Sequence, residues 1–271
     1  MQRRHARLTP REVSRNRRAR RHPRPTQFDY LHLRYLVRDL AAVLGPMRGE
    51  LDVLDLYCGS RPYEDLLPRG SRCVGFDIDD RYGAADVVSN DFLPFPDQSF
   101  DLVLCTEAFQ YVPDPARGLA EIRRVLRPGG RLILTVSFVW QYDRTILEHR
   151  YTGPELQTLF GDWDGVEVVE NGGYAVAWAT LTGRMLNMLE RAANGSAARW
   201  LLKPAFWLGY ALVNGLGVIL DRVERRGFRG PYTLPMNLRV TGCRPLEAVS
   251  KKSAGQYAPS TASAGSPGPI S

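Results

Sequence analysis

The sequence lacks the signatures of several large protein classes. It holds four cysteines in 271 residues, with neither the spacing of a zinc site nor the density of a disulfide-stapled domain. Its 25 glycines and 19 prolines follow no period and no long segment repeats, which excludes collagen-like and solenoid architectures. The basic N-terminus has no apolar run typical of a secretory signal. We therefore expect a cytoplasmic protein with reduced thiols and no metal centre.

Acidic residues are scarce at the start of the chain. Residues 1–26 contain ten arginines and one acid, Glu12, so they carry +9 and leave −2 of the net +7 to the other residues. Because this segment has little apolar surface to bury, we expect it to be a disordered arginine-rich tail that can contact polyanions. Residues 250–271, rich in Ser, Ala, Gly and Pro, are expected to form a second disordered tail.

Between the tails, short apolar runs alternate with segments of helical periodicity. This alternation predicts an α/β protein with a doubly wound, mostly parallel sheet in a single domain. The strands are expected at 51–56, 72–76, 86–89, 100–105, 131–137, 166–170 and 237–242, and the helices at 30–44, 63–67, 115–127, 153–160 and 175–226. In such sheets the ligand lies outside the carboxyl ends of the strands, beside the first strand.

Polar residues follow several of the expected strands. Gly59 follows the first strand and would let the backbone approach a ligand closely, although an ordinary turn also uses glycine. Asp77 ends the second strand, where a carboxylate can accept two hydrogen bonds from ribose hydroxyls. Asp91 and Phe92 follow the third strand and combine a polar group with an aromatic ring, as an adenine site requires. These residues predict a nucleoside-binding crevice.

The order of the motifs is more specific than any one of them. Asp55-x-x-x-Gly59 is followed by Asp77, then Asp91-x-Leu-Pro-Phe95, then Ser99-Phe-Asp-Leu-Val-Leu104, and then Arg127-Pro-Gly-Gly130. Together they resemble the class I S-adenosylmethionine-dependent methyltransferases of the small type-11 kind, over about residues 48–170. The resemblance implies a seven-stranded Rossmann-like methyltransferase fold over 27–249 and S-adenosyl-L-methionine as the cofactor.

Two further segments resemble a subgroup of that family found with sugar and polysaccharide assembly enzymes. They are Gly59-Ser-Arg-Pro-Tyr63 and Arg150-Tyr-Thr152. This likeness implies a small-molecule, sugar or lipid-linked acceptor. The cofactor-binding residues that the resemblance implies are Asp55, Tyr57, Gly59, Asp77, Ile78, Asp91, Phe92 and Cys105.

The catalytic residues are left open by the sequence. Methyl transfer has a neutral leaving group, so the enzyme mainly orients the reactants and excludes water, while a hydroxyl acceptor also benefits from a general base. Glu107 and His149 are the candidate bases, with Tyr111 as a hydrogen-bonding positioner. O-methylation of a small molecule is the preferred interpretation. The alternatives are an RNA or protein methyltransferase tethered by residues 1–26, and a non-catalytic S-adenosylmethionine-binding module.

An apolar insert of about fifty residues, 175–226, precedes the last expected strand. Its stretch 200–220 contains Lys203 as its one charged residue and is near the length of a membrane span. We expect the insert to be a helical lid over the acceptor side of the sheet. A peripheral, interfacial helix pair and a membrane-spanning helix are the other possibilities.

Overall fold

The computed structural model describes residues 7–90, 93–142, 144–193, 199–227 and 233–246. Within these ranges, seven strands form one sheet in the order β3-β2-β1-β4-β5-β7-β6, with β7 antiparallel to its two neighbours and the other pairings parallel. The strands are β1 (Asp52–Leu56), β2 (Arg72–Asp77), β3 (Val87–Val88), β4 (Phe100–Thr106), β5 (Leu126–Ser137), β6 (Asp164–Asn171) and β7 (Asn237–Cys243). The doubly wound, mostly parallel sheet expected from the sequence is confirmed.

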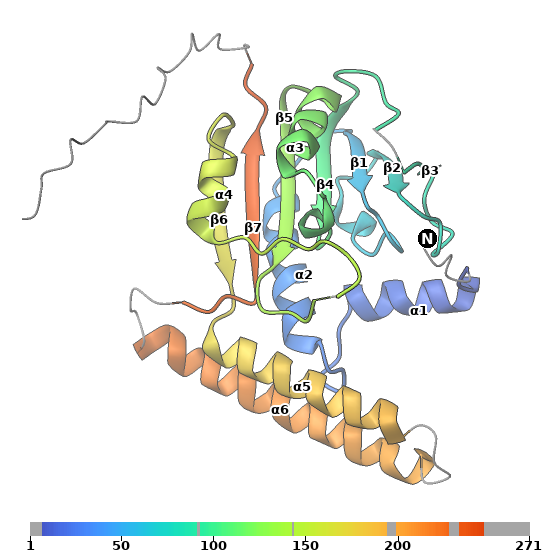
Figure 1. Ribbon diagram of the computed structural model, residues 1–271, viewed down its shortest axis with the longest axis vertical. Helices are drawn as coiled ribbons and strands as arrows, with labels where there is room; N and C mark the ends of the chain where they lie inside the picture. Colours follow the sequence, from blue (N-terminus) through green and yellow to red (C-terminus); the bar gives the residue numbers. More distant parts are fainter. Residues whose placement is uncertain (1–6, 91–92, 143, 194–198, 228–232, 247–271) are drawn as a thin grey trace, which may run out of the picture.

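Helices cover both faces of this sheet (Figure 1). One face packs on α2 (Tyr30–Leu44), whose Leu36 and Leu40 share a core cluster with Val53 of β1. The other face packs on α3 (Pro115–Val125) and α4 (Gly153–Leu159), and Leu54 of β1 belongs to that second cluster. Because successive side chains of a strand point to opposite faces, neighbouring residues of β1 serve different cores, and both must be apolar.

The segment Arg127–Gly130 differs from the sequence expectation. We expected it to end the helix before it, but α3 ends at Val125 and the segment lies within β5. The register between β4 and β5 jumps there, from Phe100 opposite Leu126 to Leu102 opposite Arg131. The proline and glycines therefore form a bulge at the start of a strand, where an irregular backbone is tolerated.

The expectation of disorder over 1–26 is wrong for part of that tail. Pro10–Arg21 form helix α1, and Thr9 and Glu12 begin it with a reciprocal capping box. The helix buries none of its own residues. Its order therefore comes from its cap and from polar contacts, a source of stability that an argument from apolar burial does not detect.

The segment 7–21 lies across the loops that follow β1 and β2. Arg17 Nε donates a hydrogen bond of 2.8 Å to the carbonyl of Ser60, and the Leu8 amide donates one of 2.8 Å to the carbonyl of Arg81. Both acceptors belong to loops at the carboxyl end of the parallel strands. The N-terminal segment thus makes hydrogen bonds to both of the loops in which the sequence analysis places cofactor-binding residues.

Deleting residues 1–26 should destabilise the protein. A few hydrogen bonds of about 1 kcal/mol each predict a fall in Tm of roughly 2–8 °C. Differential scanning calorimetry would measure it, with Arg17→Ala expected to lower Tm and Arg18→Ala, an exposed arginine beside it, expected to leave Tm unchanged. An unchanged Tm after the deletion would restore the disordered-tail interpretation.

The insert 175–226 forms two helices, α5 (Tyr174–Ala193) and α6 (Arg199–Gly227), which pack against each other and against α2. A Cβ at Gly217 of α6 would lie 2.6 Å from the Cβ of Ala179, so the close helix crossing requires glycine there. Figure 1 shows the pair beyond the carboxyl end of the parallel strands. We call this pair the α5–α6 hairpin.

Candidate active site

Strained backbone gathers where the parallel strands end. Four non-glycine residues of the described chain have a positive φ, and three of them lie in loops that follow strands: Tyr57 (φ 57°) and Arg61 (φ 53°) after β1, and Glu107 (φ 55°) after β4. A left-handed conformation costs a non-glycine residue roughly 1–2 kcal/mol, and such residues gather at functional sites. The backbone alone therefore singles out the loops after β1 and β4.

Asp77 ends β2 and faces the loop after β1. Its Oδ2 accepts a hydrogen bond of 2.9 Å from the Gly59 amide, and its Oδ1 accepts one of 2.8 Å from the Ile78 amide. Burial raises the pKa of Asp77, while these two amides act in the opposite direction. The structure thus brings three of the predicted cofactor residues together, with the side chain of Ile78 exposed.

Asp55 and Cys105 lie beneath this surface. Both are buried, in the adjacent strands β1 and β4, where Leu56 is the register partner of Cys105. Burial raises the pKa of Asp55 to about 8 and also raises the pKa of the Cys105 thiol. The remaining cofactor predictions, Asp91 and Phe92, lie outside the described residues.

Replacing Asp55 by Asn should make the protein more resistant to alkaline conditions. The folded-state pKa of about 8 exceeds the ordinary value of 3.8, so stability is lost as pH rises through that window, by up to about 1.4 kcal/mol per unit. The Asn variant has no such loss. Its Tm relative to wild type should rise from pH 4 to pH 8 and then level off, and a difference that does not vary with pH would contradict the raised pKa.

Tyr57, one of the cofactor-binding residues that the resemblance implies, lies in the loop directly after β1. Its half-buried ring packs edge-on against Phe76 of β2, with 6.1 Å between ring centroids, and joins the core cluster on that face of the sheet. Burial raises the pKa of Tyr57 to about 12, so its hydroxyl is protonated at neutral pH. The ring therefore packs on the core beneath the loop and leaves Gly59, where a Cβ would meet only the Tyr82 ring at 3.8 Å, as the close-approach position.

Glu107 forms a buried pair with His32, a residue that sequence reasoning did not select. His32 Nε2 lies 3.3 Å from Glu107 Oε2, and the Ser137 hydroxyl donates to the same carboxylate oxygen. Burial by itself would raise the pKa of Glu107, but His32 and Ser137 together hold it below its ordinary value. The carboxylate is thus ionised at neutral pH and orients the imidazole.

The other nitrogen of the imidazole is not used in the pair with Glu107. His32 Nδ1 is buried, and neither it nor Glu107 Oε1 has a hydrogen-bond partner among the described residues. The ring stacks on Trp140 with 5.1 Å between centroids, which fixes its plane. A histidine held by a carboxylate, with its second nitrogen free, is the arrangement of a general base.

Tyr111 and His149 lie together, on the loop side of Gln110. The His149 amide donates a 2.8 Å hydrogen bond to the carbonyl of Gln110, and the Gln110 side chain donates one of 3.1 Å to the carbonyl of Glu107. His149 Nε2 is buried without a hydrogen-bond partner in the part of the chain that the structure describes, whereas Tyr111 is exposed at the surface. These two candidates thus line the outer side of the loop whose inner end carries Glu107.

The fold and these loops agree with comparisons to known proteins. Residues 54–134 match a family model described as a methyltransferase domain. The 27-O-demethylrifamycin SV methyltransferase of Amycolatopsis mediterranei is 32% identical over 117 residues, which cover 35% of this chain and 42% of that protein. A demethylmenaquinone methyltransferase of a Mycobacterium species is 36% identical over 110 residues, covering 37% and 47%. The chain thus spans less than half of these relatives.

Among solved structures, the [4+2]-cyclase SpnF is 18% identical, with a TM-score of 0.50 over 80% of this chain and 83% of that one. The sheet order, the reversed β7 and the strand-end site define the Rossmann-like methyltransferase fold. With the methyltransferase domain matched over residues 54–134, they agree with the resemblance to the class I S-adenosylmethionine-dependent methyltransferases. The family resemblance seen in the sequence is therefore confirmed.

The described residues fit S-adenosyl-L-methionine, the cofactor of this family. Asp77 is the candidate carboxylate for ribose hydroxyls, and Gly59, whose amide donates to it, is the candidate position for close approach of the cofactor. The loop after β4, which begins at Glu107, borders the same strand ends. No group of three or more metal-ligating side chains occurs within the described ranges, so no metal site is assigned there.

Proposed function

We propose that the protein transfers a methyl group from S-adenosylmethionine to a hydroxyl of a small molecule. The observation that carries the proposal is the His32–Glu107 pair, because a neutral hydroxyl reacts faster when a base takes its proton. N-methylation of an amine does not need such a pair in the same way. When bound, S-adenosylmethionine supplies a methyl group on a positively charged sulfur.

In this mechanism the residues of the chain orient the cofactor, exclude water and remove the proton of the acceptor hydroxyl. Asp77 and Gly59 hold the cofactor at the ends of β1 and β2. His32 Nδ1 accepts the proton of the acceptor hydroxyl, and Glu107 stabilises the resulting imidazolium through Nε2. Tight burial around the pair keeps water out, so that the acceptor oxygen is the available nucleophile.

An apolar or lipid-linked acceptor fits the surroundings of the pair best. Trp140 stacks on His32, and Phe28 stacks on Trp140 with 6.5 Å between centroids, so aromatic rings border the base. The two relatives described above act on demethylmenaquinone and on 27-O-demethylrifamycin SV, according to their names. A sugar carried on a lipid, as in the subgroup with the Gly59–Tyr63 motif, would meet the same requirements.

The α5–α6 hairpin contacts the aromatic residues that border the His32–Glu107 pair. Arg184 of α5 donates to the Gln141 side chain at 2.7 Å and lies 5.2 Å from the centroid of the Phe28 ring. The hairpin, which the sequence analysis expects to be a lid, thus contacts Phe28. Phe28 stacks on Trp140, and Trp140 in turn stacks on His32. Contact with a polyanion through residues 1–26 and a cytoplasmic location stay predictions.

The test uses the full chain and S-adenosylmethionine labelled at the methyl group. We expect calorimetry to show cofactor binding, and label to enter the organic-soluble fraction of a cell extract in a base-stable, ether-like form. Label in RNA or protein would instead support a tethered macromolecular methyltransferase. Cofactor binding without any label transfer would identify a non-catalytic binding module.

A further inference from the structure

The outer face of α5 is apolar along almost its whole length. Between Tyr174 and Leu189, every exposed residue is apolar. These residues recur every three or four positions and so lie on one face of the helix: Tyr174, Trp178, Leu181, Met185, Met188 and Leu189. A helix that faced water would carry charged residues there.

The outer face of α6 has the same character. Between Leu201 and Leu220, every exposed residue is apolar or glycine. Its most exposed large apolar side chains, Leu201, Leu208 and Leu212, are 82%, 60% and 63% exposed. This helix is also long and apolar enough to cross a membrane, with 22% of its most apolar window buried. Soluble monomers rarely expose contiguous apolar patches beyond a few hundred Å², so the hairpin must have a partner.

The charges of the hairpin identify the kind of partner. The acidic side chains of the hairpin have partners within the protein: Asp221 binds Tyr35 and Arg225, Glu224 accepts hydrogen bonds of 2.8 Å from the first amides of α5, and Glu190 accepts one of 2.7 Å from the Tyr210 hydroxyl. Exposed arginines, by contrast, stand at the helix ends beside the apolar faces, at Arg191, Arg222 and Arg226. The surface that the hairpin offers is therefore apolar with a cationic border.

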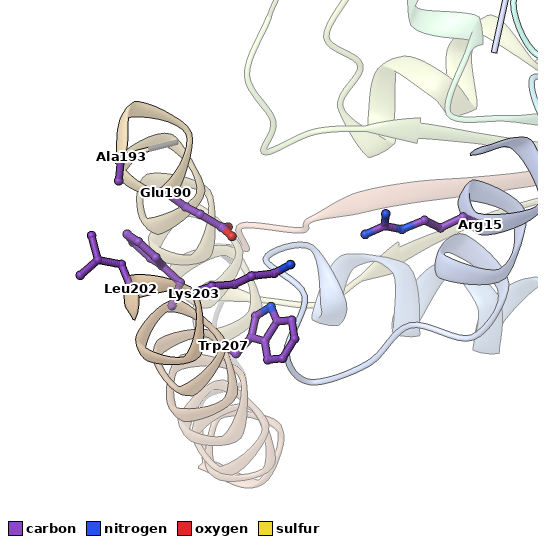
Figure 2. Close-up of a pocket in the computed structure, with 7 residues that line it drawn as sticks. Arg15, Glu190, Ala193, Leu202, Lys203 and Trp207 are labelled. Atoms are coloured by element: carbon purple, nitrogen blue, oxygen red, sulfur yellow. The ribbon is translucent and has the colours of Figure 1, made fainter. Parts of the chain in front are cut away.

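A cavity of about 250 Å³ adds to this cationic border, between α1 and the end of the hairpin. Figure 2 shows Arg15 of α1 and Lys203 of α6 pointing toward each other across it, with the Trp207 ring beside them. Lys203 Nζ lies 5.3 Å from the centroid of that ring. Glu190 also lines this cavity, and its carboxylate accepts a hydrogen bond from the Tyr210 hydroxyl. Two cations against this one carboxylate, with an aromatic ring beside an apolar helix face, match a phosphate headgroup whose acyl chains lie against the helix.

We propose that the α5–α6 hairpin docks this protein on an anionic lipid bilayer. The hairpin lies in the plane of the interface, with the apolar faces of both helices among the acyl chains and the arginines at the headgroups. A second copy of the chain would bring like charges together at the same border, so a bilayer fits the charges better. A position at the bilayer also suits an acceptor that is itself dissolved in lipid, although docking does not depend on methyl transfer.

Vesicle flotation of the full chain tests the proposal without cofactor or acceptor. We expect binding to vesicles of phosphatidylcholine with phosphatidylglycerol, growing with the anionic fraction and weakening with salt. The triple variant Leu208→Gln, Leu212→Gln, Leu216→Gln should bind about tenfold more weakly or worse. Arg222→Ala with Arg226→Ala should weaken binding to anionic vesicles, by roughly fivefold for each residue.

The controls separate docking from folding and from self-association. Ile146→Gln with Leu246→Gln removes exposed apolar side chains elsewhere on the chain and should leave flotation unchanged. All variants should keep the wild-type Tm, because the altered side chains are exposed. If the protein does not float with vesicles at any of the lipid compositions tested, the proposal is overturned. A lipid-free dimer that the triple glutamine variant converts to monomer would also overturn it, in favour of a second copy as the partner.

Discussion

Replacing His32 by Ala should slow methyl transfer to a hydroxyl acceptor by roughly 10²–10⁴-fold, the usual contribution of a general base. Cofactor affinity should stay close to that of wild type, because His32 contacts Glu107 and Trp140 and not the loop of Gly59. Single-turnover rates with labelled cofactor, together with calorimetry, would measure both quantities. His22→Ala, which removes an exposed histidine, is the matched control.

A pH profile distinguishes a lost base from a lost packing residue. Without a base, the acceptor must ionise by itself, so the residual rate of His32→Ala should rise about tenfold per pH unit below the pKa of the acceptor. The charged and titratable groups around His32 are Glu107, Asp29 and Arg20, and the Ala variant keeps all three. An equal loss at every pH, accompanied by a lower Tm, would make the role of His32 structural.

Glu107→Gln should also slow methyl transfer, by less than His32→Ala does. The amide can still accept a hydrogen bond from His32, but it cannot stabilise the imidazolium by charge. Because the two residues act as one unit, the double variant should be no slower than His32→Ala alone. Additive losses would show that Glu107 acts independently of His32.

The sheet could be predicted because its strands obey a simple rule. A strand buried on both faces is rich in apolar residues on both of its sides, and β1, with Val53, Leu54 and Leu56, and β5, with Leu132–Leu134 and Val136, have such runs. The boundaries were less certain where one element passes into the next without a loop, as α3 passes into β5 at Leu126. Such a boundary depends on how the strand pairs with its neighbours in the sheet, and the local periodicity of the sequence carries no information about that pairing.

Half of the candidate active site could not be found from the sequence. Asp77 and Gly59 belong to motifs with a fixed order, so their proximity was predictable. His32 lies on a helix far from Glu107 along the chain, and its neighbours Leu31 and Leu33 indicate only a buried face. A histidine within an apolar helix face was the one signal, and it becomes informative only when the fold brings Glu107 and Ser137 beside it.

The N-terminal segment is a case in which composition predicted too little order. Its composition predicted correctly that Pro10–Arg21 bury none of their side chains, but the disorder inferred from this is wrong for these residues, which form α1. The arginines nevertheless find fixed partners, because carbonyls such as that of Ser60 are exposed at the strand ends. Composition measures what a segment can bury, and it does not measure which acceptors a folded neighbour presents.

The cofactor site makes the second large prediction. Asp77→Ala should weaken binding of S-adenosylmethionine by roughly ten- to a hundredfold, because hydrogen bonds to a charged carboxylate contribute about 1.5–3 kcal/mol. The Ala variant also leaves the Gly59 amide without its partner at 2.9 Å, so the loop after β1 loses support. Asp77→Asn helps to separate the two effects, since it keeps one oxygen for the Gly59 amide but loses the charge and the second acceptor, which in wild type serves the Ile78 amide.

Calorimetry with S-adenosylhomocysteine and with its 2′-deoxy analogue decides whether Asp77 acts on the ribose. Wild type should bind the deoxy analogue more weakly, whereas Asp77→Ala, which has no carboxylate to pair with the missing hydroxyl, should discriminate little between the two ligands. Asp79→Ala, an exposed carboxylate two residues away, should bind both ligands as wild type does. Unchanged discrimination in Asp77→Ala would mean that the carboxylate only supports the loop through Gly59, and that another group holds the ribose.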